Sequence, residues 1–235
     1  MFDPSHINPR THPKLTRRKI DELIVQGEGT RLEFKRYFSS PEKIAKELIA
    51  FANTKGGIIL FGVDDDGSVY GLHSEKSELE EIEHTSNFLC EPPISVEWQV
   101  VQWSNGKDII AVMVSESDTK PHTLVEYEKS GKRAVTINPI GYVRVGDKSM
   151  PASREVMKVM QSRQRDAPPL RIAIGFNEKE LFEYLEENGR VAVDEFADLV
   201  NISRRRASKI IVDLVRAGTL LLHTVETKQF FTLAE

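Results

Sequence analysis

The sequence predicts an α+β fold, in which a mixed and mainly antiparallel sheet carries flanking helices, followed by a smaller helical domain. Strands and helices alternate along the first two thirds of the chain, but hairpin signals such as Asn105-Gly106 dominate the connections, which favours antiparallel pairing. Two adjacent prolines among charged residues, Pro168 and Pro169, then interrupt the pattern and predict a linker. The composition, 40% hydrophobic and 29% charged, is typical of a soluble globular protein.

These observations divide the chain into four segments. Residues 1–14 form an irregular arm, because Pro4, Pro9 and Pro13 exclude a helix there. Residues 15–163 form the first domain, residues 164–174 the linker and residues 175–235 the second domain. No apolar stretch approaches the roughly 18 residues that span a membrane, and the polar first residues do not resemble a signal peptide. We therefore expect a cytoplasmic protein with no membrane partner.

The first domain is expected to begin with a short helix, with Thr16 as its N-cap and Gly27 as the residue that ends it. Apolar and polar residues then alternate from Leu32 to Lys35, a period of two that predicts a strand. Glu33 and Lys35 share one face of that strand. Glu28 reaches the same place only if the chain bends between them.

A capped helix and a buried strand follow. Ser40 is a good N-cap for a helix that runs to about Asn53, where Gly56-Gly57 stops it. The continuous apolar run Ile58–Val63 predicts a strand covered on both faces. Asp64–Gly67 then closes a hairpin-type turn.

The rest of the first domain mixes hairpins with two helices. The expected elements are an acidic helix over 77–88 and strands over 94–103, 108–114, 123–127, 134–137 and 142–145. A last helix begins near Pro151, and its Val156, Val159 and Met160 are expected to face the sheet.

The second domain has a different pattern. It predicts a helix over 177–187, a short strand over 191–193, helices over 194–200 and 203–217, and strands over 219–223 and 229–233. Helix, strand, helix, turn, helix and a two-stranded hairpin is the order of a winged helix-turn-helix, which this domain resembles in layout.

The first domain resembles the Schlafen-type AlbA domain. The residues that carry the resemblance are Glu28, Leu32-Glu33-Phe34-Lys35, Ala50-Phe51-Ala52-Asn53-Thr54, Gly56-Gly57, Gly62-Val63-Asp64-Asp65, Gly71, Lys120-Pro121-His122 and Gly141-Tyr142-Val143-Arg144-Val145-Gly146. The resemblance covers roughly the first two thirds of the chain. It implies nucleic-acid binding, regulation or RNA cleavage, the activities described for members of the family.

Four residues of this stretch are candidate catalytic residues: Glu28, Glu33, Asp65 and Lys35. Converging carboxylates hold Mg²⁺ or Mn²⁺, which activates water at a phosphodiester, while a nearby lysine neutralises developing charge. In RNA-cleaving Schlafens an acidic triad is found at positions that resemble Glu28, Glu33 and Asp65, which the resemblance marks as metal ligands, the third within one residue. The alternative is a surface ion pair between Glu33 and Lys35 with ordinary turn-forming acids beside Gly67.

Candidate nucleic-acid contacts lie at the start of the third helix of the second domain. They are Ser203, Arg204, Arg205, Arg206 and Lys209, placed where a recognition helix enters a groove. The alternative is a winged domain used for protein contacts, with solvated arginines. Arg144 in the first domain either faces phosphate or pairs with one of the acids. His122 is expected to be a structural histidine.

Bulk properties narrow the function further. A net charge of −4 excludes a uniformly basic surface, and the single cysteine, Cys90, excludes internal disulfides and cysteine-rich zinc sites. Asp147 breaks the phosphate-loop order Gly141…Gly146-Lys-Ser, which argues against ATP hydrolysis.

The leading hypothesis is a DNA-binding transcriptional regulator that acts as a homodimer. The main alternative is a Mn²⁺- or Mg²⁺-dependent endoribonuclease acting on structured RNA such as tRNA or rRNA. An ATP-binding or protein-interaction module is a weaker alternative.

Overall fold

The computed structural model of the chain describes residues 14–72, 74–103, 106–127, 139–162, 170, 172–225 and 228–234. The chain divides into two compact units, unit 1 over Met1–Ala152 and unit 2 over Ser153–Glu235. Several predictions lie wholly or mostly outside the described residues: the N-terminal arm, the Asn105-Gly106 turn, the strand over 134–137 and most of the linker.

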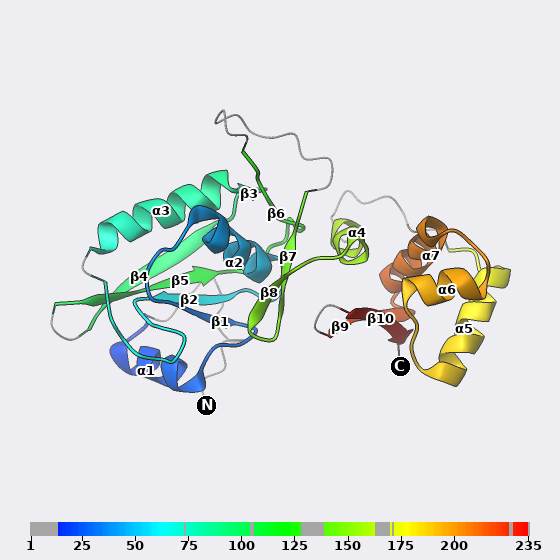
Figure 1. Cartoon of the computed structure of the whole chain (residues 1–235), viewed down its shortest axis with the longest axis horizontal. Helices are drawn as coiled ribbons and strands as arrows, with labels where there is room; N and C mark the ends of the chain where they lie inside the picture. Colours follow the sequence, from blue (N-terminus) through cyan, green and yellow to red (C-terminus); the bar gives the residue numbers. More distant parts are fainter. Residues whose placement is uncertain are drawn as a thin grey trace. The chain divides into compact units, whose positions relative to one another are not determined.

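Unit 1 is built on a four-stranded sheet with the order β1-β2-β5-β4 (Figure 1). β1 (Leu32–Lys35) and β2 (Gly57–Phe61) are parallel, as a crossover through helix α2 (Pro41–Asn53) requires. β2 pairs antiparallel with β5 (Asp108–Val114), and β5 pairs antiparallel with β4 (Val96–Gln102). The sheet is mixed and mainly antiparallel, which confirms the predicted α+β class.

Strand β2 is buried on both faces, as its continuous apolar run predicts. Ile59 and Phe61 pack in one apolar cluster with α2 and α3 (Glu75–Phe88). Ile58 and Leu60 point the other way into a second cluster with α1 (Arg17–Gln26). Figure 1 shows α2 and α3 on one face of the sheet and α1 on the other. Alternate side chains of one strand therefore hold both layers together.

The glycine pair after α2 is required by close packing. Gly56 has φ +67°, and a Cβ there would lie 2.6 Å from the Val114 carbonyl oxygen. A Cβ on Gly57 would overlap the Phe51 ring. The turn thus brings the end of α2 against β5 without space for a side chain.

Two small sheets complete unit 1. β3 (Cys90–Glu91) pairs with β6 (Thr123–Leu124), and β7 (Tyr142–Val145) pairs with β8 (Lys148–Pro151). β3 and β8 were not predicted, because short strands with mixed polarity carry little periodicity. None of the helices in the described ranges is both long and apolar enough to cross a membrane.

Unit 2 contains four helices and a hairpin. The helices are α4 (Arg154–Ser162), α5 (Phe176–Asn188), α6 (Val193–Leu199) and α7 (Arg204–Arg216), and the hairpin strands are β9 (Leu220–Val225) and β10 (Lys228–Leu233). Val191 forms a bridge with Phe231 and extends the hairpin on one side. From α5 onward the elements follow the predicted order.

The boundary between the units differs from the predicted one. The sequence indicates a first domain up to residue 163, with the helix near 154–160 on its sheet, but α4 belongs to unit 2. Val159 is buried in the same apolar cluster as Ile211 and Val215 of α7. The sequence pattern of an amphipathic helix indicates which of its faces is buried but not which neighbour covers that face. The sequence therefore places the boundary at the proline-containing segment after α4, whereas the units divide before α4.

Candidate nucleic-acid interface

The candidate acids of unit 1 gather at β1. Gly27 has φ +77° and turns the chain, so that Glu28 Oε1 accepts a hydrogen bond of 2.7 Å from the Phe34 amide. Burial raises the pKa of Glu28, and the negative charges of Glu33 and Asp65 raise it further. The bend expected between Glu28 and Glu33 is present, and Asp65 lies close enough to act on the same carboxyl group.

Glu33 is engaged by two cations. Its side chain is buried, with Oε1 accepting from Lys35 Nζ and Oε2 lying 2.9 Å from Arg144 Nη1. Both oxygens of Glu33 therefore have a cationic partner, which competes with a divalent ion for this carboxylate. In agreement, the described part of the chain contains no group of three or more His, Cys, Asp or Glu side chains placed to hold a metal.

Arg144 is a buried structural residue, which corrects the prediction that it contacts nucleic acid. Its Nη1 lies 2.9 Å from both Glu33 Oε2 and Glu47 Oε2, and its Nη2 donates to the Gly29 carbonyl oxygen at 2.7 Å. The guanidinium also lies over the Phe51 ring, 4.8 Å from its centroid. The alternative reading of the sequence, in which Arg144 pairs with an acid, is the one observed.

Glu47 is a partner that the sequence analysis missed. Burial raises the pKa of Glu47, and the charge of Glu33 raises it further, while the Ser149 hydroxyl donates to Glu47 Oε2 at 2.5 Å. A signal was available, because Glu47 lies three residues after Ile44 and four before Phe51. An acid on the apolar face of a helix needs a buried cationic partner.

The remaining signature residues of unit 1 meet at Asn53 and Thr54. Asn53 Nδ2 donates to the carbonyl oxygens of His122 at 2.8 Å and Tyr142 at 3.0 Å, and its Oδ1 accepts from the His122 amide at 2.7 Å. Thr54 Oγ1 accepts from the Arg144 amide at 2.9 Å. Segments 69 to 90 residues apart are thereby joined at the end of α2.

His122 has the structural role expected of it. Its Nδ1 lies 2.7 Å from the Pro92 carbonyl oxygen and its Nε2 lies 2.6 Å from Ser117 Oγ. Burial lowers the pKa of His122, and the charge of Lys120 lowers it further. The ring is a loop anchor with both nitrogens engaged.

In unit 2, helix α7 begins as predicted, but its first arginine is engaged. Ser203 Oγ accepts from the Arg206 amide at 3.3 Å and caps the helix. Arg204 Nε lies 2.8 Å from Asp194 Oδ1, and Arg204 Nη1 lies 3.5 Å from the buried Glu155. Arg204 therefore ties α7 to α6 and α4, while its side chain stays half exposed.

The neighbouring bases of α7 point to solvent. Arg205 and Arg206 are exposed, and no side-chain partner for either is found among the described residues. Lys209 forms an exposed pair of 2.7 Å with Asp213, a kind of interaction that contributes little to stability.

An open cavity of about 580 Å³ lies between α7 and α4. Five basic residues line it: Lys158, Arg205, Arg206, Lys209 and Arg216. Lys158 was missed because α4 was assigned to the other domain, and its Nζ donates to Ser208 Oγ at 2.8 Å. Asp213 is the one acid among the described residues that line it, so this described lining is cationic.

Comparison with protein families fixes the identity of unit 1. The family described as Schlafen, AlbA_2 matches residues 28–153, which is more than half of the chain. The chain belongs to the Schlafen AlbA_2 family. The match includes every signature residue that meets at Glu33, Asn53 and Arg144.

Two solved structures are similar to this Schlafen AlbA_2 chain. One is the crystal structure of the DIP2311 protein from Corynebacterium diphtheriae, with 14% identity, a TM-score of 0.44, and coverage of 80% of this chain and 35% of that one. This chain thus spans about a third of that protein. The other is the solution structure of the N-terminal domain of a RecG-related protein from Nitrosomonas europaea, with 23% identity, a TM-score of 0.39, and coverage of 67% and 92%. No curated protein matches the sequence.

Proposed function

We propose that this protein binds nucleic acid and that unit 2 is a winged helix-turn-helix which contacts duplex DNA, in a role in transcription regulation. The observation that carries the proposal is the exposed Arg205 and Arg206, which have no side-chain partner among the described residues and lie beside Lys158, Lys209 and Arg216 around one open cavity. Membership of the Schlafen AlbA_2 family supports an interaction with nucleic acid.

The layout of unit 2 supports α7 as the recognition helix. α6 and α7 are joined by a short turn at Asn201, which has φ +51°, and the β9–β10 hairpin follows α7 directly, where a wing is expected. The buried face of α7, including Ala207 and Ile211, packs into the core of unit 2. The face with Arg205 and Arg206 is left for a partner.

Charge supports a nucleic-acid partner over a protein one. The chain as a whole carries a net charge of −4, yet the described residues that line this cavity include five bases and one acid. A local cationic patch on an acidic protein attracts phosphates and releases their counterions. Phosphate contacts from Arg205 and Arg206 supply affinity, and an arginine that reaches a base edge supplies specificity.

The test is duplex-DNA binding by the double variant Arg205→Ala/Arg206→Ala. We expect weaker binding and a dependence of log affinity on log salt that is shallower by about two, since each phosphate contact contributes a slope of about 0.9. The control is Lys43→Ala/Lys179→Ala, which removes the same charge from exposed positions of α2 and α5. An unchanged salt slope in the α7 variant would refute the role of this helix.

The dimer is a separate part of the proposal. Readers of this type bind paired half-sites as symmetric dimers. Light scattering at micromolar concentration is expected to give twice the mass of the chain, and a monomeric mass would remove the dimer.

A metal-dependent endoribonuclease is the second candidate, favoured by the neighbouring Glu28, Glu33 and Asp65. Against it stands the engagement of Glu33 by Lys35 and Arg144. Incubation of tRNA with Mn²⁺ and the protein tests the hypothesis, with Asp65→Asn and Glu33→Gln beside the wild type. Asp65 is exposed, so its variant keeps the fold, and cleavage that is absent or independent of both residues would eliminate the candidate.

A further inference from the structure

Unit 1 contains a second pocket, of about 420 Å³, away from the buried Arg144 cluster. It lies where the end of β1, the segment after β2 and the start of α3 meet. Its lining includes Arg36, Tyr37, Tyr70, Glu78 and Lys107.

The pocket exposes two large aromatic rings. Tyr37 is 60% exposed and Tyr70 is 40% exposed. Burial of either ring would stabilise the folded protein, so their exposure needs a reason. Two exposed aromatic rings that line one pocket offer apolar surface to a ligand, and such an exposed patch in a pocket marks a binding site.

One cation–π contact is present in this pocket. The Arg36 guanidinium lies over the Tyr70 ring, 3.7 Å from its centroid. Its contact with Asp64 is loose, at 3.8 Å and half-exposed. A guanidinium is planar and can stack on a second planar group as well as on the ring beside it.

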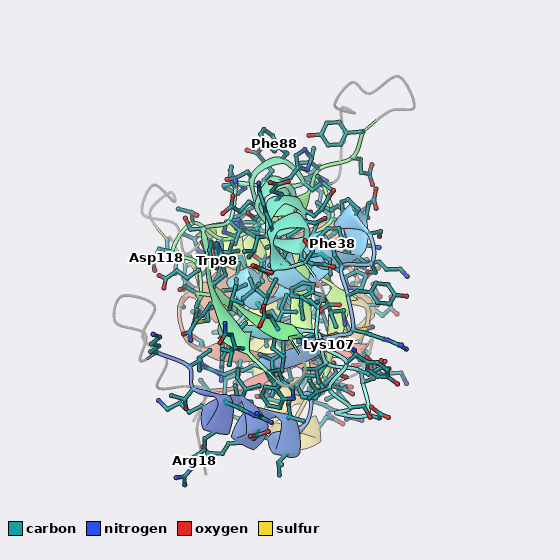
Figure 2. The ribbon with its side chains drawn as sticks, turned by 90° about the vertical axis from the view of Figure 1, so that its left-hand side faces the viewer. Arg18, Phe38, Phe88, Trp98, Lys107 and Asp118 are labelled. Carbon is teal, nitrogen blue, oxygen red and sulfur yellow. The ribbon has the colours of Figure 1, made fainter. Side chains whose placement is uncertain are left out.

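Lys107 brings a second cation to the same pocket. A Cβ on Gly71 would lie 2.5 Å from Lys107 Cβ, so the stem of Lys107 crosses directly over this glycine. The backbone of Leu72 exchanges hydrogen bonds of 2.7 and 3.2 Å with Asp108 and fixes this crossing. Figure 2 shows Lys107 at the end of unit 1 between α3 and α1.

We propose that this pocket binds one unpaired base of a single-stranded nucleic acid, with the base stacked against Tyr37 and the Arg36–Tyr70 pair and its phosphate facing Lys107. Stacking on aromatic and guanidinium planes needs a base that is free of its duplex neighbours. The adjacent acids Glu78 and Glu81 of α3 repel a continuous phosphate backbone, which favours one extruded nucleotide over a duplex. The site rests on the proposed nucleic-acid function but lies in the other unit.

The test is fluorescence anisotropy of the full chain with a labelled 12-nucleotide single strand and an abasic strand of equal length and charge. We expect the base-containing strand to bind at least fivefold more tightly than the abasic strand, since stacking contributes about 1–3 kcal/mol per base. Tyr37→Ala and Tyr70→Ala are expected to remove this preference, while Tyr37→Phe keeps it. Lys107→Met is expected to make the salt dependence shallower by about 0.7.

Tyr127→Ala is the matched control, because Tyr127 is 48% exposed and lies outside the pocket. Equal binding of the two strands, or a preference that survives Tyr37→Ala, overturns the pocket. Duplex binding by Arg205→Ala/Arg206→Ala separates the two proposals. If Arg205→Ala/Arg206→Ala loses duplex binding but the preference for the base-containing strand does not depend on Tyr37, only the pocket is refuted. If that preference depends on Tyr37 but Arg205→Ala/Arg206→Ala keeps duplex binding, only the α7 interface is refuted.

Discussion

Arg144 Nη1 lies 2.9 Å from Glu33 Oε2, and this ion pair joins β7 to β1 with the arginine side chain fully shielded from water. Glu47 completes the group from α2. One guanidinium of β7 therefore balances the charge of two acids on β1 and α2, which lie 111 and 97 residues earlier in the sequence. Burial of such a group is favourable only while all its members are present.

Replacing Arg144 with alanine is expected to destabilise unit 1 by about 3–5 kcal/mol, because Glu47 would lose its cationic partner and the buried Glu33 would be left with Lys35 alone. Urea unfolding measures the change. Arg18→Ala, which removes an exposed arginine paired with Glu22, is expected to change the free energy of unfolding by less than about 1 kcal/mol. Equal effects of the two variants would show that the cluster is not a structural joint.

The raised pKa of Glu28 predicts that the free energy of unfolding depends on pH. Its folded-state pKa is raised above the ordinary value of 4.5, chiefly by burial, so the folded state retains the proton more readily than the unfolded state. The stability that this provides is complete below about pH 4.5 and is lost as the pH rises through the folded pKa. Glu28→Gln keeps an acceptor for the Phe34 amide but cannot ionise.

Relative to the wild type, Glu28→Gln is therefore expected to gain stability as the pH rises from 4 to 7, measured by urea unfolding at each pH. Glu22→Gln, at an exposed position of α1, serves as the control. A difference between Glu28→Gln and wild type that stays constant with pH, or falls, would contradict the raised pKa.

Asn53→Ala is expected to destabilise unit 1 by at least about 2 kcal/mol, because it leaves the buried His122 and Tyr142 backbone groups without partners. Asn87→Ala removes an exposed asparagine from α3 and is expected to have a small effect. Comparison of the two unfolding curves tests whether the buried amide is essential. Similar midpoints for both variants would count against that role.

Gly56→Ala combines a left-handed backbone with a collision against the Val114 carbonyl oxygen, so we expect a loss of more than about 1 kcal/mol. Gly29→Ala is the matched control, since a Cβ there meets nothing within 4 Å. Thermal unfolding compares the two. A tolerated Gly56→Ala would mean that the α2–β2 turn adjusts freely.

Arg204→Ala distinguishes structure from binding on α7. Because Arg204 pairs with Asp194 and the buried Glu155, its loss is expected to lower the stability of unit 2 while leaving the salt slope of duplex binding unchanged. Arg205→Ala is expected to leave the stability of unit 2 unchanged and to make the salt slope of duplex binding shallower. Calorimetry and salt titration of the same two variants provide the check.

Local patterns predicted the elements that carry periodicity or a cap. The two-sided burial of Ile58–Val63, the Ser40 and Ser203 caps and the order of elements from α5 to β10 follow from residues close together in the chain. The site required knowledge of distant partners. No local pattern shows that Arg144 pairs with Glu33 and does not contact phosphate. In the same way, no local pattern shows that α4 packs on α7 and not on the sheet.

The junction at Asn53 also constrains how unit 1 is made. Among the described residues, the hydrogen-bond partners of its side chain are residues 122 and 142, so a chain still emerging from the ribosome at residue 110 holds α2, β1 and β2 without the segments that lock them. We expect the nascent sheet to stay open until synthesis passes β7, and folding to be governed by this late, long-range closure. Shortened chains that stop before Tyr142 should accordingly be protease-sensitive throughout.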